Sequence, residues 1–194
     1  MKTQRQRTKL AGSTKWLVGL LVLVGLTSLL AVPIALGHPV PLVLPYNWHK
    51  WLHVFGAVLF LGNILVTGFW MLLAERSGDE PSIRFAAIVV NWADVFFTAP
   101  GVILLLGNGI LLSQQWGGLS QMAWIRISLI LFTLSGVIWV AALIPIQNRL
   151  AYWAETSGSL PVAFFKALHW WYFWGLMATL LPLGSMMLMV VKPS

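Results

Sequence analysis

Five long apolar segments, separated by short connections rich in charged residues, proline or glycine, divide the sequence. They cover residues 16–36, 48–73, 83–112, 123–147 and 162–191. Each is long enough for the roughly 20 residues that an α-helix needs to cross a bilayer core of about 30 Å. The alternation of period two that a transmembrane β-barrel requires is absent. We therefore predict an all-α, polytopic membrane bundle of five transmembrane helices, with a four-helix core at 48–191 and a leading helix at 16–36.

Basic residues are distributed unevenly between the connections. Nine of the 12 Lys and Arg residues lie in the N-terminal tail, the turn that ends at Arg84 and the 148–166 connection, whereas Lys50, Arg126 and Lys192 lie on the other side. Cytoplasmic loops carry the excess of basic residues in membrane proteins. We therefore expect residues 1–15 to be a basic cytoplasmic tail and the C-terminus to lie outside, in a bacterial inner membrane.

The net charge of +7 has the same explanation and does not call for a nucleic-acid partner. The expected partner is the lipid bilayer, and a homo-oligomer or a larger membrane complex remains open. Because the chain has no cysteine, disulfides and thiolate metal sites are excluded.

The leading segment has two interpretations. Ala35-Leu36-Gly37 places small residues where a signal peptidase cleaves, yet the apolar run is longer than the core of a typical signal peptide. We expect the segment to be retained as a first transmembrane helix, with a signal anchor or cleaved leader as the alternative.

Polar and small residues recur at helical spacing in three segments, and residues at such spacing share one helix face. The series are His49, His53, Gly56, Phe60, Asn63, Thr67 and Trp70; Arg84, Ala87, Asn91, Asp94, Thr98, Gly101, Leu105 and Asn108; and Arg126, Thr133, Gly136 and Gln147. We expect these faces to point into the bundle, because the remaining residues suit lipid or neighbouring helices.

A rise of about 1.5 Å per residue sorts the polar residues by depth into two clusters. The outer cluster contains His53, Arg126 and Asn108, with His49, Lys50 and His38 just above them, and the inner cluster contains Asp94, Asn63, Thr67, His169 and Tyr172. His53 and His169 should lie roughly 20 Å or more apart, too far to be the two axial ligands of one haem. A haem with one histidine ligand, or one bridging two chains, remains open.

Each cluster has a functional and a structural interpretation. Asp94 is the candidate catalytic residue for proton chemistry, and hydrogen bonding or pairing with a group such as His169 is the structural alternative. His49 and His53, with His38 as a third, are weak candidates for metal ligands, the alternative being an interhelical hydrogen bond. Arg126 could hold a propionate or a phosphate, or extend its charge to the interface.

The chain resembles a known group at two places. Trp51-Leu52-His53-Val54-Phe55-Gly56-Ala57-Val58-Leu59-Phe60-Leu61-Gly62-Asn63 and the ending Met189-Val190-Val191-Lys192-Pro193 resemble an uncharacterised bacterial family of predicted integral membrane proteins, over roughly residues 48–193. More distantly, the pattern is similar to HemJ-type protoporphyrinogen oxidases and CopD-like copper-resistance proteins, which share a Leu-His-x-x-(Gly/Ala) start of a four-helix core.

The resemblance implies a site at the outer end. His53 matches a HemJ histidine of the haem or porphyrin site, but the HemJ lysine falls on Arg126, and the Asn-Glu pair near the last helix is missing. Porphyrin oxidation is therefore not expected. We expect binding of haem b or another redox cofactor by His53, Arg126, His49 and Asn108, with His53 and Arg126 approaching each other. The alternative is a non-enzymatic copper-handling module, for which Met186, Met187 and Met189 are soft ligands, or an accessory subunit.

Overall fold

The computed structural model describes residues 11–193, which form helices joined by short turns. The elements are α1 (Gly12–Ser28), α2 (Ala31–Ala35), α3 (Tyr46–Ser77), α4 (Glu80–Ala93), η1 (Asp94–Thr98), α5 (Ala99–Ser113), η2 (Gln114–Trp116), α6 (Ala123–Ile138), η3 (Trp139–Leu143), α7 (Ile144–Thr156) and α8 (Val162–Val191). Consecutive elements join into five helices long and apolar enough to cross a membrane. The predicted all-α bundle of five helices is confirmed for the described part of the chain.

The first two membrane helices begin earlier than the hydrophobic pattern indicated, whereas α6 and α8 begin at the predicted residues. α1 starts at Gly12, inside the expected basic tail, and α3 starts at Tyr46, directly after Pro45. Residues 1–10 of that tail lie outside the described residues.

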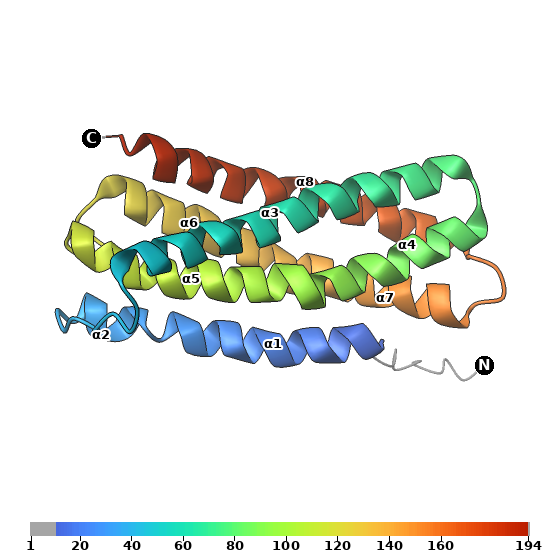
Figure 1. The fold of residues 1–194 in the computed structure, drawn as a ribbon. Helices are drawn as coiled ribbons and strands as arrows, with labels where there is room; N and C mark the ends of the chain where they lie inside the picture. Colours follow the sequence, from blue (N-terminus) through green and yellow to red (C-terminus); the bar gives the residue numbers. More distant parts are fainter. Residues whose placement is uncertain (1–10, 194) are drawn as a thin grey trace, which may run out of the picture.

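The five helices lie side by side along one common direction (Figure 1). α3 packs mainly against α5, α6 packs mainly against α8, and α4 packs against α7. At one end of the bundle, called here the Glu80 end, α1 and α8 begin and α3 turns into α4. At the opposite Lys192 end, α8 terminates and α5 turns into α6 (Figure 1). Five spans thus place the start of α1 and the end of α8 at opposite ends.

Two of the membrane helices contain a π-helical segment, and each segment is followed by a proline. η1 precedes Ala99-Pro100, and η3 precedes Ile144-Pro145. Proline has no N–H to donate and its ring displaces the carbonyl one turn earlier, so the helix widens locally. The N–H of Ala99 therefore bonds to the carbonyl of Asp94, five residues back. Such wide turns occur frequently at functional sites.

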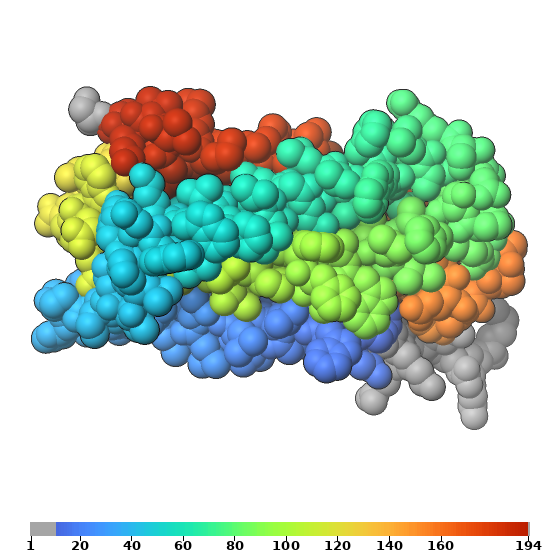
Figure 2. Space-filling view, in the orientation of Figure 1, coloured from blue at the N-terminus to red at the C-terminus, as the bar shows by residue number. Residues whose placement is uncertain are grey.

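α1 is joined to the bundle by polar as well as apolar contacts. The N–H of Ala11 donates to Asn148 Oδ1 at 2.9 Å, and Asn91 Nδ2 donates to Thr14 Oγ1 at 3.0 Å. Leu17 is fully buried. Figure 2 shows the side chains of α1 in continuous contact with the neighbouring helices.

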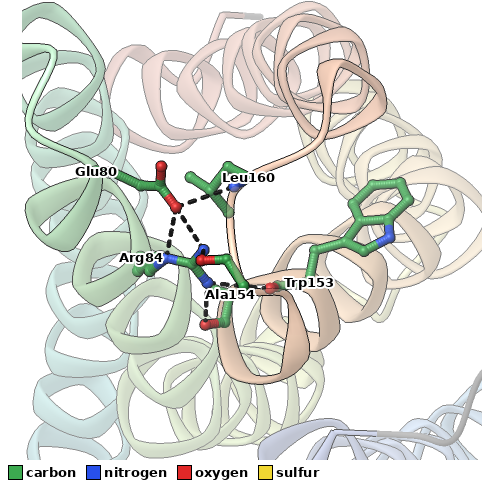
Figure 3. A network of polar contacts seen from close by, with 6 residues as sticks. Glu80, Arg84, Trp153, Ala154 and Leu160 are labelled. Carbon is green, nitrogen blue, oxygen red and sulfur yellow. Dashed lines mark hydrogen bonds and ion pairs between the residues drawn. The ribbon is translucent and has the colours of Figure 1, made fainter.

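Salt-bridged and capping residues close the Glu80 end (Figure 3). Arg84 pairs with Glu80 and donates to the carbonyls of Trp153 and Ala154, at 3.3 and 2.9 Å, where α7 ends. Glu80 also accepts the N–H of Leu160 at 2.9 Å. The carbonyl of Trp153 also accepts the N–H of Ser157, whereas the guanidinium provides a donor for the carbonyl of Ala154 in the last turn of α7 and complements the helix dipole. The residues of Figure 3 therefore fasten α4 to α7 and to the start of α8.

Asp79 caps the same helix from the turn before it. Its side chain accepts the N–H of Ser82 and also pairs with the Ser82 hydroxyl. These hydrogen bonds favour the charged carboxylate and lower the pKa of Asp79.

Replacing Arg84 with glutamine is expected to lower the free energy of unfolding by about 2 kcal/mol, because charge-assisted hydrogen bonds to two half-buried carbonyls at the end of α7 are lost. Arg149→Gln is the matched control, since Arg149 is exposed and bonds to no other described residue. Thermal unfolding in detergent measures both. Equal melting temperatures for the two variants would contradict the role assigned to Arg84.

Candidate functional site

The polar face of α3 and the polar face of α4–η1–α5 meet along the bundle in antiparallel register. From the Lys192 end inward, His49 contacts Asn108, His53 contacts Leu105, Gly56 contacts Gly101, and Asn63 contacts Asp94 and Thr98. Both faces point into the protein, as the sequence indicated. The exception is Trp70, the last residue of the α3 series, which is exposed.

The two glycines allow the closest approach of the two backbones. A Cβ atom added to Gly56 would lie 2.5 Å from the nitrogen of Leu105 and 2.7 Å from the oxygen of Gly101. A Cβ atom on Gly101 would lie 2.9 Å from the oxygen of Gly56. Only glycine fits at such distances. The contact closes the α3–α5 seam between its outer and inner polar residues.

Asp94 lies at the centre of the inner polar residues and is 5% exposed. Its Oδ1 accepts the Thr98 hydroxyl at 2.6 Å and Asn63 Nδ2 at 3.2 Å, and its Oδ2 accepts Gln147 Nε2 at 2.8 Å. Asn63 Nδ2 also donates to Thr98 Oγ1 at 2.8 Å. We call Asn63, Asp94, Thr98 and Gln147 the Asp94 cluster.

The Asp94 cluster stands between the two widened turns. Asp94 is the first residue of η1, Gln147 follows Pro145 just beyond η3, and Trp139, the first residue of η3, lies beside the carboxyl. The partners of Asp94 are all neutral, and neither ion pair found within residues 11–193 involves it. An intramembrane carboxyl without a cation is therefore a candidate functional residue.

The expected contact with Asn63 is present, and Thr67 lies one turn further along α3, donating to the carbonyl of Asn63 at 2.6 Å. The suggested pairing of Asp94 with His169 is wrong. His169 is exposed on α8, donates to the carbonyl of Phe165 and lies 3.7 Å from Glu75. Tyr172 packs edge-on against His169. Both residues lie near Glu75, close to the end of α3 (Tyr46–Ser77) and about three turns beyond Asn63, so they are separated from Asp94 along the bundle.

A small cavity extends from the Asp94 cluster toward the Glu80 end. It measures about 10 Å³ and is lined by Met71, Ala87, Val90, Gln147, Leu150 and Trp171. Two buried polar atoms on its walls, Gln147 Oε1 and Trp171 Nε1, bond to no other described residue. One is an acceptor and the other a donor, and the volume is near the minimum that holds one water molecule.

At the Lys192 end, His49 is a structural residue. Its Nε2 accepts the N–H of Leu44 at 3.3 Å, so Nδ1 carries the hydrogen and donates to Asn108 Oδ1 at 2.7 Å. Both ring nitrogens are therefore occupied, and His49 fastens the proline-rich 37–45 connection to α3 and α5. Asn108 is engaged as well, since its Nδ2 donates to the carbonyl of Leu104 at 2.7 Å.

The predicted approach of His53 and Arg126 is not found. His53 Nδ1 bonds to the carbonyl of Leu105 at 2.7 Å, with the ring packed against Gly109. Arg126 is exposed and donates to the carbonyl of Ser120 at 3.0 Å. α3 pairs with α5 whereas α6 pairs with α8, so residues at equal depth on α3 and α6 need not face each other.

The metal-binding candidates are not brought together either. No group of three or more His, Cys, Asp or Glu side chains that could hold a metal ion occurs within residues 11–193, so His38, His49 and His53 do not form a triad. Met186 and Met187 are 46% and 62% exposed on α8, as lipid-facing side chains would be.

A family model described as a predicted integral membrane protein (DUF2269) matches residues 47–193, so the chain belongs to that family. The match covers α3 to α8. No curated protein and no solved structure matches the chain.

Proposed function

We propose that the protein is a proton-handling membrane protein in which Asp94 takes up and releases a proton. The proposal rests on the neutral side chains around this carboxyl, which can hydrogen-bond to both its ionised and its protonated form. When Asp94 is ionised, it accepts from Thr98, Asn63 and Gln147. When it is protonated, its hydrogen can be donated to the Thr98 oxygen or, after the amide turns over, to the oxygen of Gln147. Neither form leaves the carboxyl unpaired.

We further propose that this proton exchanges with water at the Glu80 end. On α3, Asn63, Thr67, Met71 and Glu75 follow one another at intervals of four residues, so they form one stripe toward that end. A water in the cavity beside Met71 would bond to Gln147 and Trp171 and would extend the polar contacts of Asp94 in the same direction. On the other side, the Gly56–Gly101 contact and the buried ring of Phe60 separate Asp94 from the Lys192 end.

The distribution of basic residues supports placing the Glu80 end in the cytoplasm. Arg76, Arg84, Arg149 and Lys166 are at this end, whereas Lys50, Arg126 and Lys192 are at the opposite one. The C-terminus is then outside, because five spans place the start of α1 and the end of α8 on opposite sides of the membrane. Reporter fusions after Ser77 and after Ser194 test this orientation, and an outside signal at Ser77 contradicts it.

Trp139 provides a test of the proton site, because its indole lies beside the carboxyl of Asp94. The tryptophan fluorescence of the purified protein is expected to change sigmoidally with pH, and Asp94→Asn and Trp139→Phe should each remove that change. Asp79→Asn, which removes a carboxylate in the turn at the Glu80 end, should retain it. If Asp94→Asn titrates like the unmodified protein, Asp94 is not the proton site.

One observation favours a second candidate function, the binding of haem b or another metal cofactor by His53. Since Nδ1 of His53 donates to a backbone carbonyl, its Nε2 keeps a free lone pair, which is the arrangement that orients a histidine ligand toward a metal. His53 would supply one axial ligand near the Lys192 end. A Soret band in purified protein, lost in His53→Ala and kept in His49→Ala, supports it; a colourless, metal-free preparation contradicts it.

A further inference from the structure

A groove runs along the outside of the bundle between α3 and the α4–η1 helix. Its volume is about 440 Å³, and its walls include Gly62, Asn63, Val66, Trp70, Trp92 and Phe96. Val66, Trp70 and Phe96 are 44%, 53% and 64% exposed, so the groove is open to its surroundings. Because these helices cross the membrane, the groove opens toward the lipid, and only molecules dissolved in the bilayer can enter it.

Asn63 contributes a polar side chain to this mainly apolar groove. Both hydrogens of Asn63 Nδ2 are donated to Asp94 and Thr98, which leaves Asn63 Oδ1 as an acceptor that bonds to no described residue. Asn63 is half-buried and lines the groove. The complement of this atom is a hydrogen-bond donor, so a hydroxyl fits and a carbonyl oxygen does not.

The depth of Asn63 in the membrane and the side chains that line the groove further restrict which ligands fit. Asn63 lies near the middle of α3 (Tyr46–Ser77), at a depth that the charged headgroup of a phospholipid does not reach. Four aromatic side chains, those of Trp70, Trp92, Phe96 and Phe97, line the groove, and the rings of Trp92 and Phe96 are stacked with their centroids 5.8 Å apart. Opposite them, Gly62 has no side chain. An aromatic ring packs favourably against aromatic side chains, so a weakly polar aromatic ring suits this lining.

We propose that the groove binds a membrane-soluble hydroquinone, with a ring hydroxyl donating to Asn63 Oδ1 and an apolar tail along Val66 and Trp70. The proposal stands on the groove and on Asn63, independently of whether Asp94 titrates. A lipid acyl chain, which has no donor, is the competing occupant.

Three matched probes test the proposal: a short-chain alkyl hydroquinone, the corresponding quinone and the corresponding alkylbenzene. Binding is measured anaerobically by equilibrium dialysis against nanodiscs, with protein-free nanodiscs as the background. The hydroquinone should bind about 3- to 10-fold more tightly than the quinone or the alkylbenzene, the difference expected from one hydrogen bond. Equal binding of all three probes would show a non-selective lipid groove and overturn the proposal.

Two glycines of α3 provide the paired variants. A Cβ atom at either Gly62 or Gly68 would have nothing within 4 Å, but only Gly62 lines the groove. Gly62→Leu should therefore abolish selective hydroquinone binding, and Gly68→Leu should leave it unchanged, with both proteins folded. Undiminished binding in Gly62→Leu would place the hydroquinone elsewhere and also overturn the proposal.

Discussion

Replacing Gly56 with alanine is expected to destabilise the bundle by about 1–3 kcal/mol, the usual range for an overpacked contact. The added Cβ would lie 2.5 Å from the backbone nitrogen of Leu105 and 2.7 Å from the carbonyl oxygen of Gly101. These are main-chain atoms, so α3 and α5 must separate before the methyl group fits. That separation would also lengthen the hydrogen bonds on either side of it, between His49 and Asn108 and between Asn63 and Asp94.

Gly68→Ala is the matched control on the same helix, because its Cβ would have nothing within 4 Å. Alanine is favoured over glycine within a helix by roughly 0.5–1 kcal/mol. The two substitutions should therefore change the melting temperature in opposite directions, down for Gly56→Ala and unchanged or up for Gly68→Ala. If both raise it, the close approach of α3 and α5 is wrong.

Replacing Asp94 with leucine should have the largest effect on stability. It removes the acceptor of Thr98, Asn63 and Gln147 together, and an unpaired buried donor costs about 1–3 kcal/mol. Allowing for partial rearrangement, we expect a loss of about 3–5 kcal/mol in the free energy of unfolding. Thr133→Leu, on the exposed face of α6, should change it by less than about 0.5 kcal/mol.

Asp94→Asn should behave differently from Asp94→Leu. The introduced amide keeps one acceptor for Thr98 and Asn63, and its N–H can be accepted by Gln147 Oε1 once that amide turns over. Stability should then fall by no more than about 1 kcal/mol, while proton binding is lost. Chemical unfolding of the two variants distinguishes these outcomes, and equal destabilisation would show that the charge of Asp94 itself holds the helices together.

The paired polar faces of α3 and α4–η1–α5 were predictable, because helical periodicity determines which residues share a face. The contact of Asn63 with Asp94 follows from periodicity and depth together. Neither property tells which helices are neighbours. His53 and Arg126 have similar depths, yet α3 lies against α5 and α6 against α8, so the two side chains have separate partners.

The contact between Gln147 and Asp94 was not predicted from the sequence, for a second reason. Regular spacing assigned Gln147 to the same face as Arg126 and Thr133, but those two residues are exposed whereas Gln147 is buried against Asp94. The π-helical segment η3 lies between them. One additional residue in a turn rotates the following helix by about 100°, which turns Gln147 inward. Pro145 was the visible signal for this irregularity.

The proposed function requires that Asp94 bind and release a proton inside the membrane. Infrared spectroscopy of the protein in nanodiscs tests it most directly, because a protonated carboxyl has a C=O stretching band that the carboxylate lacks. The titration runs from about pH 4 to about pH 10, which covers ordinary and shifted carboxyl groups. We expect a band that weakens as the pH rises, returns when the pH is lowered and is missing in Asp94→Asn. Identical titration spectra for Asp94→Asn and the unmodified protein would contradict the claim.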